Sequence, residues 1–495
     1  MPRYSYDRLT ALDNSFLLLE KPHAYMHVAS TGIYQMGPLE TAEGGVDIEL
    51  IRRGVHGILH RIPRYRQKLA WIPIERQPVW VDDDRFNLNY HLRHASLPRP
   101  GDEEQLKRLS ARIMAQRLDR TRPLWEMWII EGLEGSRFAL ISKVHHCMID
   151  GVSGVDLLTV LMNPSPDAEI PEAPPFVPRP EPSGFELLRN EVGRRIRLPM
   201  GAARGLRNLV NEARDARQEL LSRFRAMAET VGSTLRSASS TPLNQPVGPH
   251  RRFDWVSMEI QEIKELRRTL GGSLNDVVLT ITTGAVRRFL QQRQVDPAKL
   301  DFRVLAPVSV RTEDQSGKLG NRVSAWILPL PVGEPDPLEQ LKAISRTTAE
   351  LKSSKQAVGA EVLTQVAEWT PATLLSLGAR NATRLLPFNL VVTNIPGPQV
   401  PLYLLGAKME QIYPYVPLAD NLGLGIALFS YDGALAWGFN ADYELLPDLD
   451  QFVAAIRTSF QALREAAGVA SPAPRRRKPA RSGKASRANG GSAPS

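Results

Sequence analysis

The chain has 495 residues, 42% of them hydrophobic and 23% charged, with a formal net charge of +9, which is ordinary for a globular protein of two or three domains. The single cysteine, Cys147, excludes a disulfide within the chain and suits a reducing compartment. No apolar run reaches the roughly 20 residues that span a bilayer and no signal-peptide pattern opens the sequence, so we expect any membrane contact to be peripheral.

The first segment is expected to combine helices with strands that pair in one sheet. Apolar periodicity predicts a helix from Asp47 to His60, before Pro63, and a second helix from Glu103 to Leu118. Short apolar runs at Met127 to Ile130 and Phe138 to Val144 are typical of buried strands. We expect these two strands to be neighbours in the sheet.

Two pairs of histidines lie four residues apart in this segment, which is a spacing that can place two metal ligands together. The pairs are His23 with His27 and His56 with His60. Neither pair encloses the glutamate of a zinc-protease helix, and no third ligand accompanies either pair. We therefore predict no metal site.

The strongest chemical signal follows the second of the two strands, where the chain reads HHCMIDG from His145 to Gly151. A helix is expected directly afterwards, from Val152 to Met162, so both histidines lie where a strand gives way to a loop. A neutral imidazole in such a place can accept a proton from an alcohol at physiological pH. Gly151 allows the backbone to turn sharply.

A change of composition separates the two halves of the chain. Residues 163–184 contain eight prolines together with acidic residues, which indicates an extended linker. Residues 185–236 favour helix, with a break at Pro199, an apolar stripe, and eleven arginines against six acids. We favour a crossover helix that packs on the protein, and a basic amphipathic helix on lipid is the alternative.

The second half again mixes strands with helices, which predicts a further α/β layer. The expected strands are Arg252 to Ile260, Phe302 to Val308, Arg322 to Pro331, Leu390 to Thr393, Leu424 to Tyr431 and Ala434 to Ala441. The expected helices are Ile263 to Leu270, Ser273 to Gln291, Pro337 to Ser354 and Leu449 to Ala467. Either Ser273 or Asn275 can cap the second of these helices.

The last 25 residues, 471–495, hold seven basic residues and no acidic one among serine, proline, alanine and glycine. This composition predicts a disordered tail. Its charge favours attraction to an anionic lipid surface, or a simple gain in solubility. No aromatic residues are interleaved with the basic ones, so we predict no nucleic-acid partner.

Several motifs occur in an order that resembles the bacterial wax ester synthase/acyl-CoA:diacylglycerol acyltransferase family, within the coenzyme A-dependent acyltransferase superfamily. The likeness spans about residues 5–465. The motifs are LDNSFLLLE, PRYRQKL, PVWVDD, LDRTRPLWE and HHCMIDG in the first half, and TPLN, LND, PVSVR, GN and NIPGP in the second.

The resemblance implies an α/β fold made of two chloramphenicol acetyltransferase-like domains, with mixed sheets, flanking helices and an active-site channel at their interface. We place an N-terminal domain at residues 1–162, a linker with basic crossover helices at 163–250, a C-terminal domain at 251–470 and the tail at 471–495. The protein is then expected in the cytoplasm, at the inner face of the membrane or on lipid droplets.

The same resemblance implies an acyl-CoA-dependent O-acyltransferase in which His146 is the general base and His145 supports the loop or the substrate. Diacylglycerol is the first choice of acceptor. Long-chain fatty alcohols, which would make the protein a wax ester synthase, come second, and another hydroxyl, a polyketide or an amine remains open. Acyl-CoA is a substrate, and no cofactor is expected. A lipid-surface binding protein is the non-enzymatic alternative, against which the intact HHCMIDG argues.

Further residues receive roles from the motifs that contain them. Asn275, Asp276 and Trp125 are candidates for the channel, and Asn275 is at least as well explained as a helix cap. Superfamily resemblance implies that Asp150 forms a salt bridge with an arginine, for which Arg311 is the candidate.

Cys147 lies beside the histidines and could act as a covalent nucleophile. Its place among the variable residues of the motif gives no reason to prefer that route. Direct attack by the alcohol in a ternary complex is simpler, so we expect no covalent intermediate on this thiol.

Overall fold

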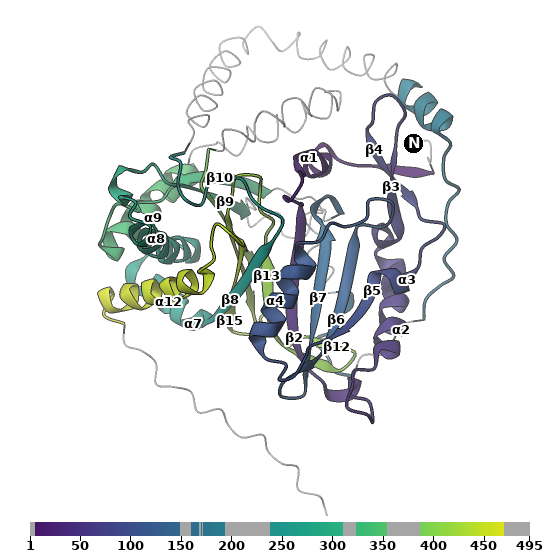
Figure 1. The fold of residues 1–495 in the computed structure, drawn as a ribbon, viewed down its shortest axis with the longest axis horizontal. Coiled ribbons are helices and arrows are strands. Elements are labelled where there is room, and N and C mark those ends of the chain that lie inside the picture. Colours follow the sequence, from purple (N-terminus) through teal and green to yellow (C-terminus); the bar gives the residue numbers. More distant parts are fainter. Residues whose placement is uncertain are drawn as a thin grey trace, which may run out of the picture.

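The computed structural model of the chain contains two six-stranded sheets that lie side by side, with helices between and around them (Figure 1). The residues that it describes are 5–148, 160–167, 170, 172–193, 238–309, 323–353 and 387–469. Short 3-10 turns punctuate the connections, and their bounds are η1 (Gly37–Leu39), η2 (Leu59–Arg61), η3 (Pro63–Arg66), η4 (His146–Met148) and η5 (Pro297–Lys299).

The first sheet has the strand order β12-β13-β2-β7-β6-β5 and is mixed, because β5 runs parallel to β6 while β2, β7 and β6 are antiparallel. The pairing of β6 with β7 confirms the predicted neighbours. Its strands are β2 (His27–Gln35), β5 (Leu92–Ser96), β6 (Trp125–Leu133), β7 (Arg137–His145), β12 (Tyr403–Leu404) and β13 (Ala407–Tyr415).

Four helices accompany this sheet: α1 (Ala11–Leu19), α2 (Ile48–Ile58), α3 (Leu88–His91) and α4 (Glu103–Met114). The predicted helices that begin near Asp47 and Glu103 are both confirmed. Each begins after an aspartate whose side chain accepts a backbone N–H of the first turn, as Asp47 does from Leu50 and Asp102 from Gln105.

A small separate sheet with the order β1-β4-β3 is formed by β1 (Tyr6–Arg8), β3 (Gln67–Trp71) and β4 (Pro78–Asp82). The predicted linker runs past it, and residues 172–183 have no regular secondary structure, as expected. Arg179 of this segment forms ion pairs with Asp82 and Asp7. The predicted crossover helix is seen over residues 184–193, and its remainder lies outside the described residues.

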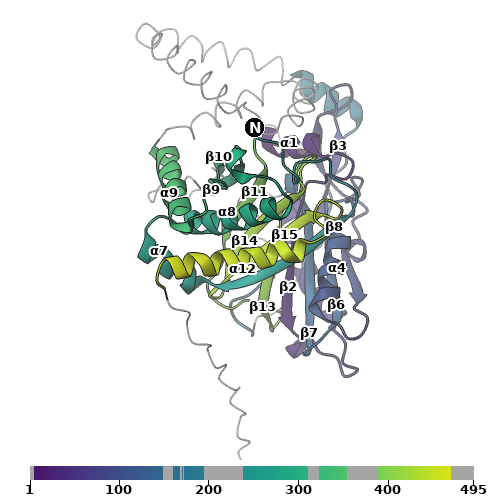
Figure 2. The same ribbon diagram turned by 60° about the vertical axis from the view of Figure 1, so that its left-hand side comes forward.

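The second sheet has the order β10-β9-β11-β14-β15-β8 and is also mixed, because β11 runs parallel to β9 and β14. Helices α7 (Ile260–Leu270), α8 (Leu274–Gln292), α9 (Pro337–Ser353) and α12 (Leu449–Ala466) lie to one side of it (Figures 1 and 2). Its strands are β8 (Arg251–Glu259), β9 (Arg303–Ser309), β10 (Val323–Pro329), β11 (Leu390–Pro396), β14 (Leu424–Tyr431) and β15 (Ala434–Asp442). Every strand and helix predicted in this half is confirmed.

The second half of the chain contributes two strands to the first sheet, which the sequence did not predict. β12 and β13 follow β11 in the second half, yet β13 pairs with β2 and so extends the first sheet. At Gly438 of β15 a β-carbon would lie 1.8 Å from the carbonyl oxygen of Pro414 in β13. Only glycine permits this approach, so the contact between the sheets depends on it.

A shared apolar core joins the sheets at α4. Ile113 of α4, Ile141 of β7, Tyr413 of β13 and Trp255 of β8 belong to one buried cluster. Trp255 stacks on Tyr413 with ring centroids 4.6 Å apart, which is a favourable aromatic geometry. A membrane-crossing helix would need more length and more apolar character than any helix of the described residues has.

Candidate active site

The two motif histidines lie at the end of β7, the strand that β2 and β6 flank. His145 is the last residue of β7 and His146 the first of η4, as the sequence predicts for a strand that ends at the motif. The backbone N–H of His145 donates to the carbonyl of Leu124 (2.9 Å) and that of His146 to the carbonyl of Met26 (2.8 Å). These two backbone hydrogen bonds therefore fix the position of the backbone from which both histidine side chains extend.

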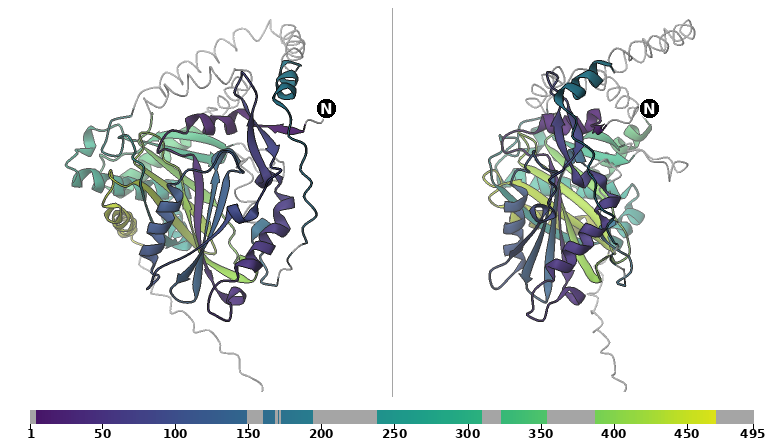
Figure 3. Two further views of the ribbon diagram at one scale, coloured as in Figure 1. Left: turned by 45° about the vertical axis from the view of Figure 1, so that its right-hand side comes forward. Right: turned by 90° about the vertical axis from the view of Figure 1, so that its right-hand side faces the viewer.

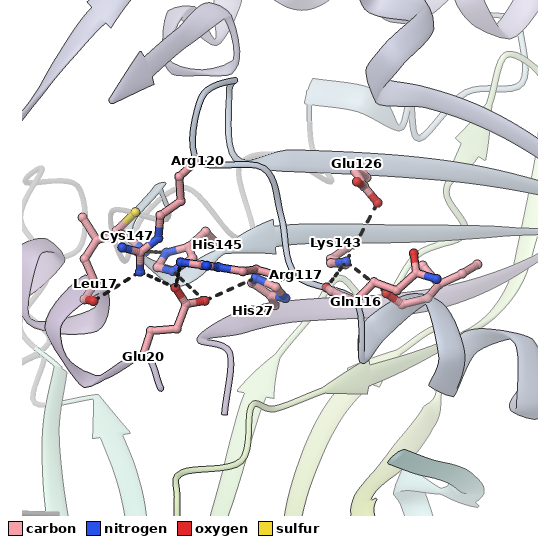
Figure 4. A network of polar contacts seen from close by, with 11 residues as sticks. Leu17, Glu20, His27, Gln116, Arg117, Arg120, Glu126, Lys143, His145 and Cys147 are labelled. Carbon is pink, nitrogen blue, oxygen red and sulfur yellow. Dashed lines mark hydrogen bonds and ion pairs between the residues drawn. The ribbon is translucent and has the colours of Figure 1, made fainter. Parts of the chain in front are cut away.

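His145 is fully buried and its orientation is set by the loop itself. Its Nδ1 accepts the backbone N–H of Cys147 at 3.2 Å. An Nδ1 that accepts cannot carry the hydrogen, so a neutral His145 carries it on Nε2. That nitrogen lies 3.7 Å from Oε1 of the buried Glu20 (Figure 4).

Glu20 follows α1 directly and is the centre of a buried polar cluster (Figure 4). Its carboxylate forms an ion pair with Arg120 and lies 3.7 Å from Nε2 of His27 as well as of His145. Burial alone would raise the pKa of Glu20, but His145 and Arg120 hold it below its usual value. We call Glu20, His27, Arg120 and His145 the buried cluster.

A second buried charge stands on the same strand, two residues before His145. The ammonium of Lys143 donates to the carbonyls of Ile113 (3.0 Å) and Gln116 (2.6 Å) at the end of α4, where helix carbonyls lack helical partners. Its Nζ is 3.9 Å from the carboxylate of Glu126. Burial lowers the pKa of Lys143 to about 8. Burial also lowers the pKa of His27, and the positive charge of Lys143 lowers it further.

His146 has a different environment from that of its neighbour. Its ring is partly exposed and stacks on Phe16 of α1, with centroids 3.8 Å apart and an interplanar angle of 18°. Its buried Nδ1 makes no hydrogen bond to another described residue. Burial lowers the pKa of His146 to about 4, with a further contribution from His145. The imidazole is therefore neutral at physiological pH and can accept a proton.

Cys147 is buried in the apolar core of the first half. Burial raises the pKa of its thiol, and the carboxyl of Asp13 adds to that effect. Because the thiolate is the reactive form, this environment disfavours a covalent route through sulfur.

Trp125 packs beneath the strand that carries the motif. Its indole N–H donates to the carbonyl of Tyr65 at 2.8 Å, and its ring stacks on His91 with centroids 4.6 Å apart. The side chain is fully buried, and its position is explained by packing opposite Val144. Its predicted place in a channel stays a prediction.

The two candidates at the start of α8 have separate partners. Ser273, not Asn275, caps the helix, in a reciprocal box with Asp276 whose bonds are 3.2 and 2.7 Å long. Asp276 is buried and also accepts from Thr348 of α9 at 2.9 Å, which gives it a structural role. Asn275 instead accepts a hydrogen bond from Asn394 at 2.7 Å, so the LND and NIPGP motifs meet.

Three motif residues, Asp150, Gly151 and Arg311, lie outside the described residues, as do most of the helix predicted from Val152 and the basic tail. The salt bridge between Asp150 and Arg311 stays a prediction. Within the part of the chain that the structure describes, no group of three or more histidine, cysteine or acidic residues is arranged to hold a metal ion.

Sequence reasoning missed Glu20 and Arg120, although both belong to motifs that carry the family resemblance. Glu20 ends an apolar run and Arg120 follows a helical one. The periodicity of these runs accounts for the neighbouring residues but gives no signal for Glu20 or Arg120 themselves. The available signal was a lone acid at the end of the apolar run LDNSFLLL, because an acid there needs a partner if it is buried.

Comparison with known proteins places these features in a family. The catalytic domain described as wax ester synthase/diacylglycerol acyltransferase matches residues 9–278, and the C-terminal domain of the same proteins matches residues 319–464. A putative diacylglycerol O-acyltransferase of Mycobacterium tuberculosis is 32% identical to this chain over 458 residues, 90% of this chain and 87% of the relative.

Solved structures show the same likeness. A wax ester synthase/diacylglycerol acyltransferase from Marinobacter aquaeolei is 25% identical, with a TM-score of 0.67 over 93% of this chain and 100% of its own. The starter condensation domain of rhizomide synthetase has 13% identity and a TM-score of 0.56, over 94% of this chain and 95% of its own, and shares the fold. The expected acetyltransferase-like fold class is confirmed.

Proposed function

The chain belongs to the wax ester synthase/diacylglycerol acyltransferase family and is an acyl-CoA-dependent O-acyltransferase, and we propose that its acceptor is a diacylglycerol and its general base His146. The observation that supports the assignment of the general base is the environment of His146. A partly exposed imidazole whose pKa burial lowers to about 4 stays neutral and ready to accept a proton.

In the proposed reaction His146 removes the proton of the acceptor hydroxyl while the hydroxyl oxygen attacks the thioester carbonyl of acyl-CoA. The tetrahedral intermediate collapses, the carbon–sulfur bond breaks, and the coenzyme A thiolate leaves. The imidazolium returns its proton to that thiolate, so the products are the ester and free coenzyme A. A general base of this kind typically contributes about 10²–10⁴-fold.

His145 is proposed as a positioning residue. Its ring is held between the Cys147 amide and the Glu20 carboxylate, and the next residue along the chain is the base. A fixed tautomer at His145 keeps the turn at η4 in one conformation, which supports the orientation of His146.

Asn275 is proposed as a polar group near the reacting carbonyl. Its oxygen is occupied by Asn394 (2.7 Å), and no described residue accepts from its amide N–H₂. A free amide donor suits an oxyanion, for which removal of one donor typically costs about 10²–10³-fold.

Diacylglycerol is the first acceptor because the matched mycobacterial relative carries that activity in its name. Fatty alcohol is the second candidate, since the matched catalytic domain and the Marinobacter structure are named for wax ester synthesis as well. Both acceptors reside in lipid, so we propose that the enzyme works at the surface of a membrane or a lipid droplet.

The test follows free coenzyme A released from palmitoyl-CoA by the purified protein. We expect release only when an alcohol is present, faster with dioleoylglycerol than with hexadecanol or an amine, and a triacylglycerol product identified by mass. Higher turnover on hexadecanol would assign wax ester synthesis instead. Release without any acceptor would mean hydrolysis and would contradict the proposal.

A further inference from the structure

One face of helix α1 covers both motif histidines. The residues of that face, at the three- and four-residue spacing of neighbours on a helix, are Asp13, Phe16, Leu17 and Glu20. Phe16 stacks on the ring of His146. Glu20 lies 3.7 Å from Nε2 of His145. A single short helix thus contacts the ring of one histidine and approaches a buried nitrogen of the other.

The position of this helix is held by contacts that do not involve His146. In both views of Figure 3, α1 is the purple helix close to the N-terminus and lies at the end of the first sheet where β7 stops. Leu17 is buried in the same apolar core as Cys147, and its carbonyl accepts a hydrogen bond from Arg120 at 3.3 Å. Thr10 caps the helix by accepting the N–H of Asp13. The helix is therefore a fixed support against which the histidine ring rests.

The contact between Phe16 and His146 is close and nearly parallel. The ring centroids are 3.8 Å apart and the ring planes differ by 18°. At this separation the rings are in van der Waals contact, so no water fits between them. A turn of the imidazole about its bond to the β-carbon would drive its edge into the phenyl ring. The stack therefore restrains the plane of the imidazole.

His146 needs such a restraint because hydrogen bonds do not supply one. The terminal torsion of a histidine side chain is broad, so covalent geometry leaves the plane of the imidazole free to turn. The buried Nδ1 of His146 makes no hydrogen bond to another described residue. The ring of His145, in contrast, lies between the amide of Cys147 and the carboxylate of Glu20.

The plane of the His146 ring decides where its reactive nitrogen points. Nδ1 is buried while the side chain as a whole is partly exposed, so Nε2 is the nitrogen that an acceptor hydroxyl can approach. A general base must lie within about 2.6–3.2 Å of the group whose proton it takes. A turned ring would carry Nε2 out of that reach.

We propose that Phe16 is the positioning residue of the base, and that its phenyl ring fixes the plane of the His146 imidazole so that Nε2 stays directed at the acceptor hydroxyl. The proposal rests on the proposed function, because His146 needs a fixed direction as a general base. The role requires a flat ring and not only apolar volume. An aliphatic side chain would fill the site without restraining the imidazole plane.

The test compares substitutions of Phe16 in the full chain, with palmitoyl-CoA and 1-hexanol as substrates. Phe16→Tyr keeps the ring and should keep kcat within about twofold of the wild type. Phe16→Leu keeps apolar volume without the ring and should lower kcat by at least about tenfold, because a misdirected base costs transition-state stabilisation. KM for palmitoyl-CoA should stay within about twofold, since binding of the thioester does not use this contact.

The matched control is Leu18→Ala, which shortens a half-buried side chain of the same helix. Leu18 is two residues from Phe16, so it points to the other side of α1. This variant should keep the kcat and KM of the wild type. Phe16→Leu should melt close to the control, which separates a loss of turnover from a loss of folded protein.

A second measurement observes the stack without any reaction. In protein labelled with ¹³C in its histidine rings, the His146 signal is identified by its absence from His146→Ala. A ring proton held over a phenyl face is shielded, so this signal should move downfield in Phe16→Leu. It should keep its position in Leu18→Ala.

Two results would overturn the assignment. One is wild-type turnover of Phe16→Leu, which would reduce Phe16 to apolar filling. The other is an unchanged His146 signal in that variant, which would show that the two rings do not stack. A fully active His146→Ala protein, or a wild type that releases no coenzyme A, would instead contradict the proposed function, so the two failures are distinguishable.

Discussion

Two neighbouring regions at the end of β7 each contain a motif histidine, and they give these histidines opposite environments. In the buried cluster, His145 is enclosed by polar groups that fix its tautomer and orientation. One residue later, His146 has an aromatic ring as its main contact and a partly exposed side chain. This difference is what the proposed roles require, because a positioning residue needs a fixed side chain and a general base needs an accessible one.

The difference arises from where the strand ends. His145 is still paired with His27 in the β2–β7 ladder, so its side chain is directed to the face that α4 and Glu20 cover. His146 belongs to η4, where the backbone has left the ladder. Strand geometry thus supplies the rigid residue and the following turn supplies the accessible one.

The largest expected effect comes from His146→Ala. Turnover should fall by at least about 10²-fold, the low end for a general base, while the melting temperature stays close to that of the wild type. Coenzyme A release and thermal melting check the two parts. His145→Ala is the comparison variant and should lose less turnover but more stability. A fully active His146→Ala protein would remove the basis of the mechanism.

The next largest effect is expected from a change in the buried cluster. Glu20→Ala removes the buried carboxylate that pairs with Arg120, whose side chain is 26% exposed, so the loss of unfolding free energy should approach but not exceed the about 3–5 kcal/mol typical of a fully buried pair. Urea unfolding measures it. Glu49→Ala is the control, because it removes an exposed glutamate that pairs with Arg52 and should change stability by less than about 0.5 kcal/mol. Equal losses in the two variants would refute the buried cluster as a structural unit.

A third test concerns Asp150, which follows the two histidines in the HHCMIDG motif. If Asp150 pairs with Arg311, Asp150→Ala should lower the unfolding free energy as well as activity, unlike His146→Ala. A double-mutant cycle with both residues should then show coupling well above about 0.5 kcal/mol, the scatter of independent sites. If the effects of the two substitutions on the unfolding free energy simply add, Asp150 and Arg311 do not form a salt bridge.

The smallest effect is expected at Cys147. Because burial raises the pKa of this thiol, Cys147→Ala should keep turnover within about threefold of the wild type. Trapping of an acyl group on the protein after incubation with palmitoyl-CoA, followed by mass, is the complementary measurement. An acylated Cys147 would show a covalent route and overturn direct attack.

Much of this arrangement could be predicted from the sequence where local pattern decides structure. The apolar run that ends at Val144 identified β7, and the motif after it identified the turn. The helix that begins after Ser273 was predicted together with its possible caps, although only the structure separated Ser273 from Asn275.

What could not be predicted depends on contacts between distant residues or on broken patterns. β13 contains Pro414 and a register shift between Met409 and Gln411, and each of these disrupts the alternation that identifies a strand. Glu20, Arg120 and His145 are far apart in the chain, and only the packing of α1 on η4 brings them together. No local periodicity encodes such a contact.

The central claim is that His146 is a neutral base, and the pH dependence of kcat/KM on a soluble alcohol tests it most directly. Because burial lowers the pKa of His146 from 6.5 to about 4, the reactive neutral form persists as pH falls through 6.5. We predict that kcat/KM stays level from pH 7 to about pH 5.5 and declines only as the pH approaches about 4, with circular dichroism to verify folding. A decline centred near pH 6.5 in a folded protein would contradict the account.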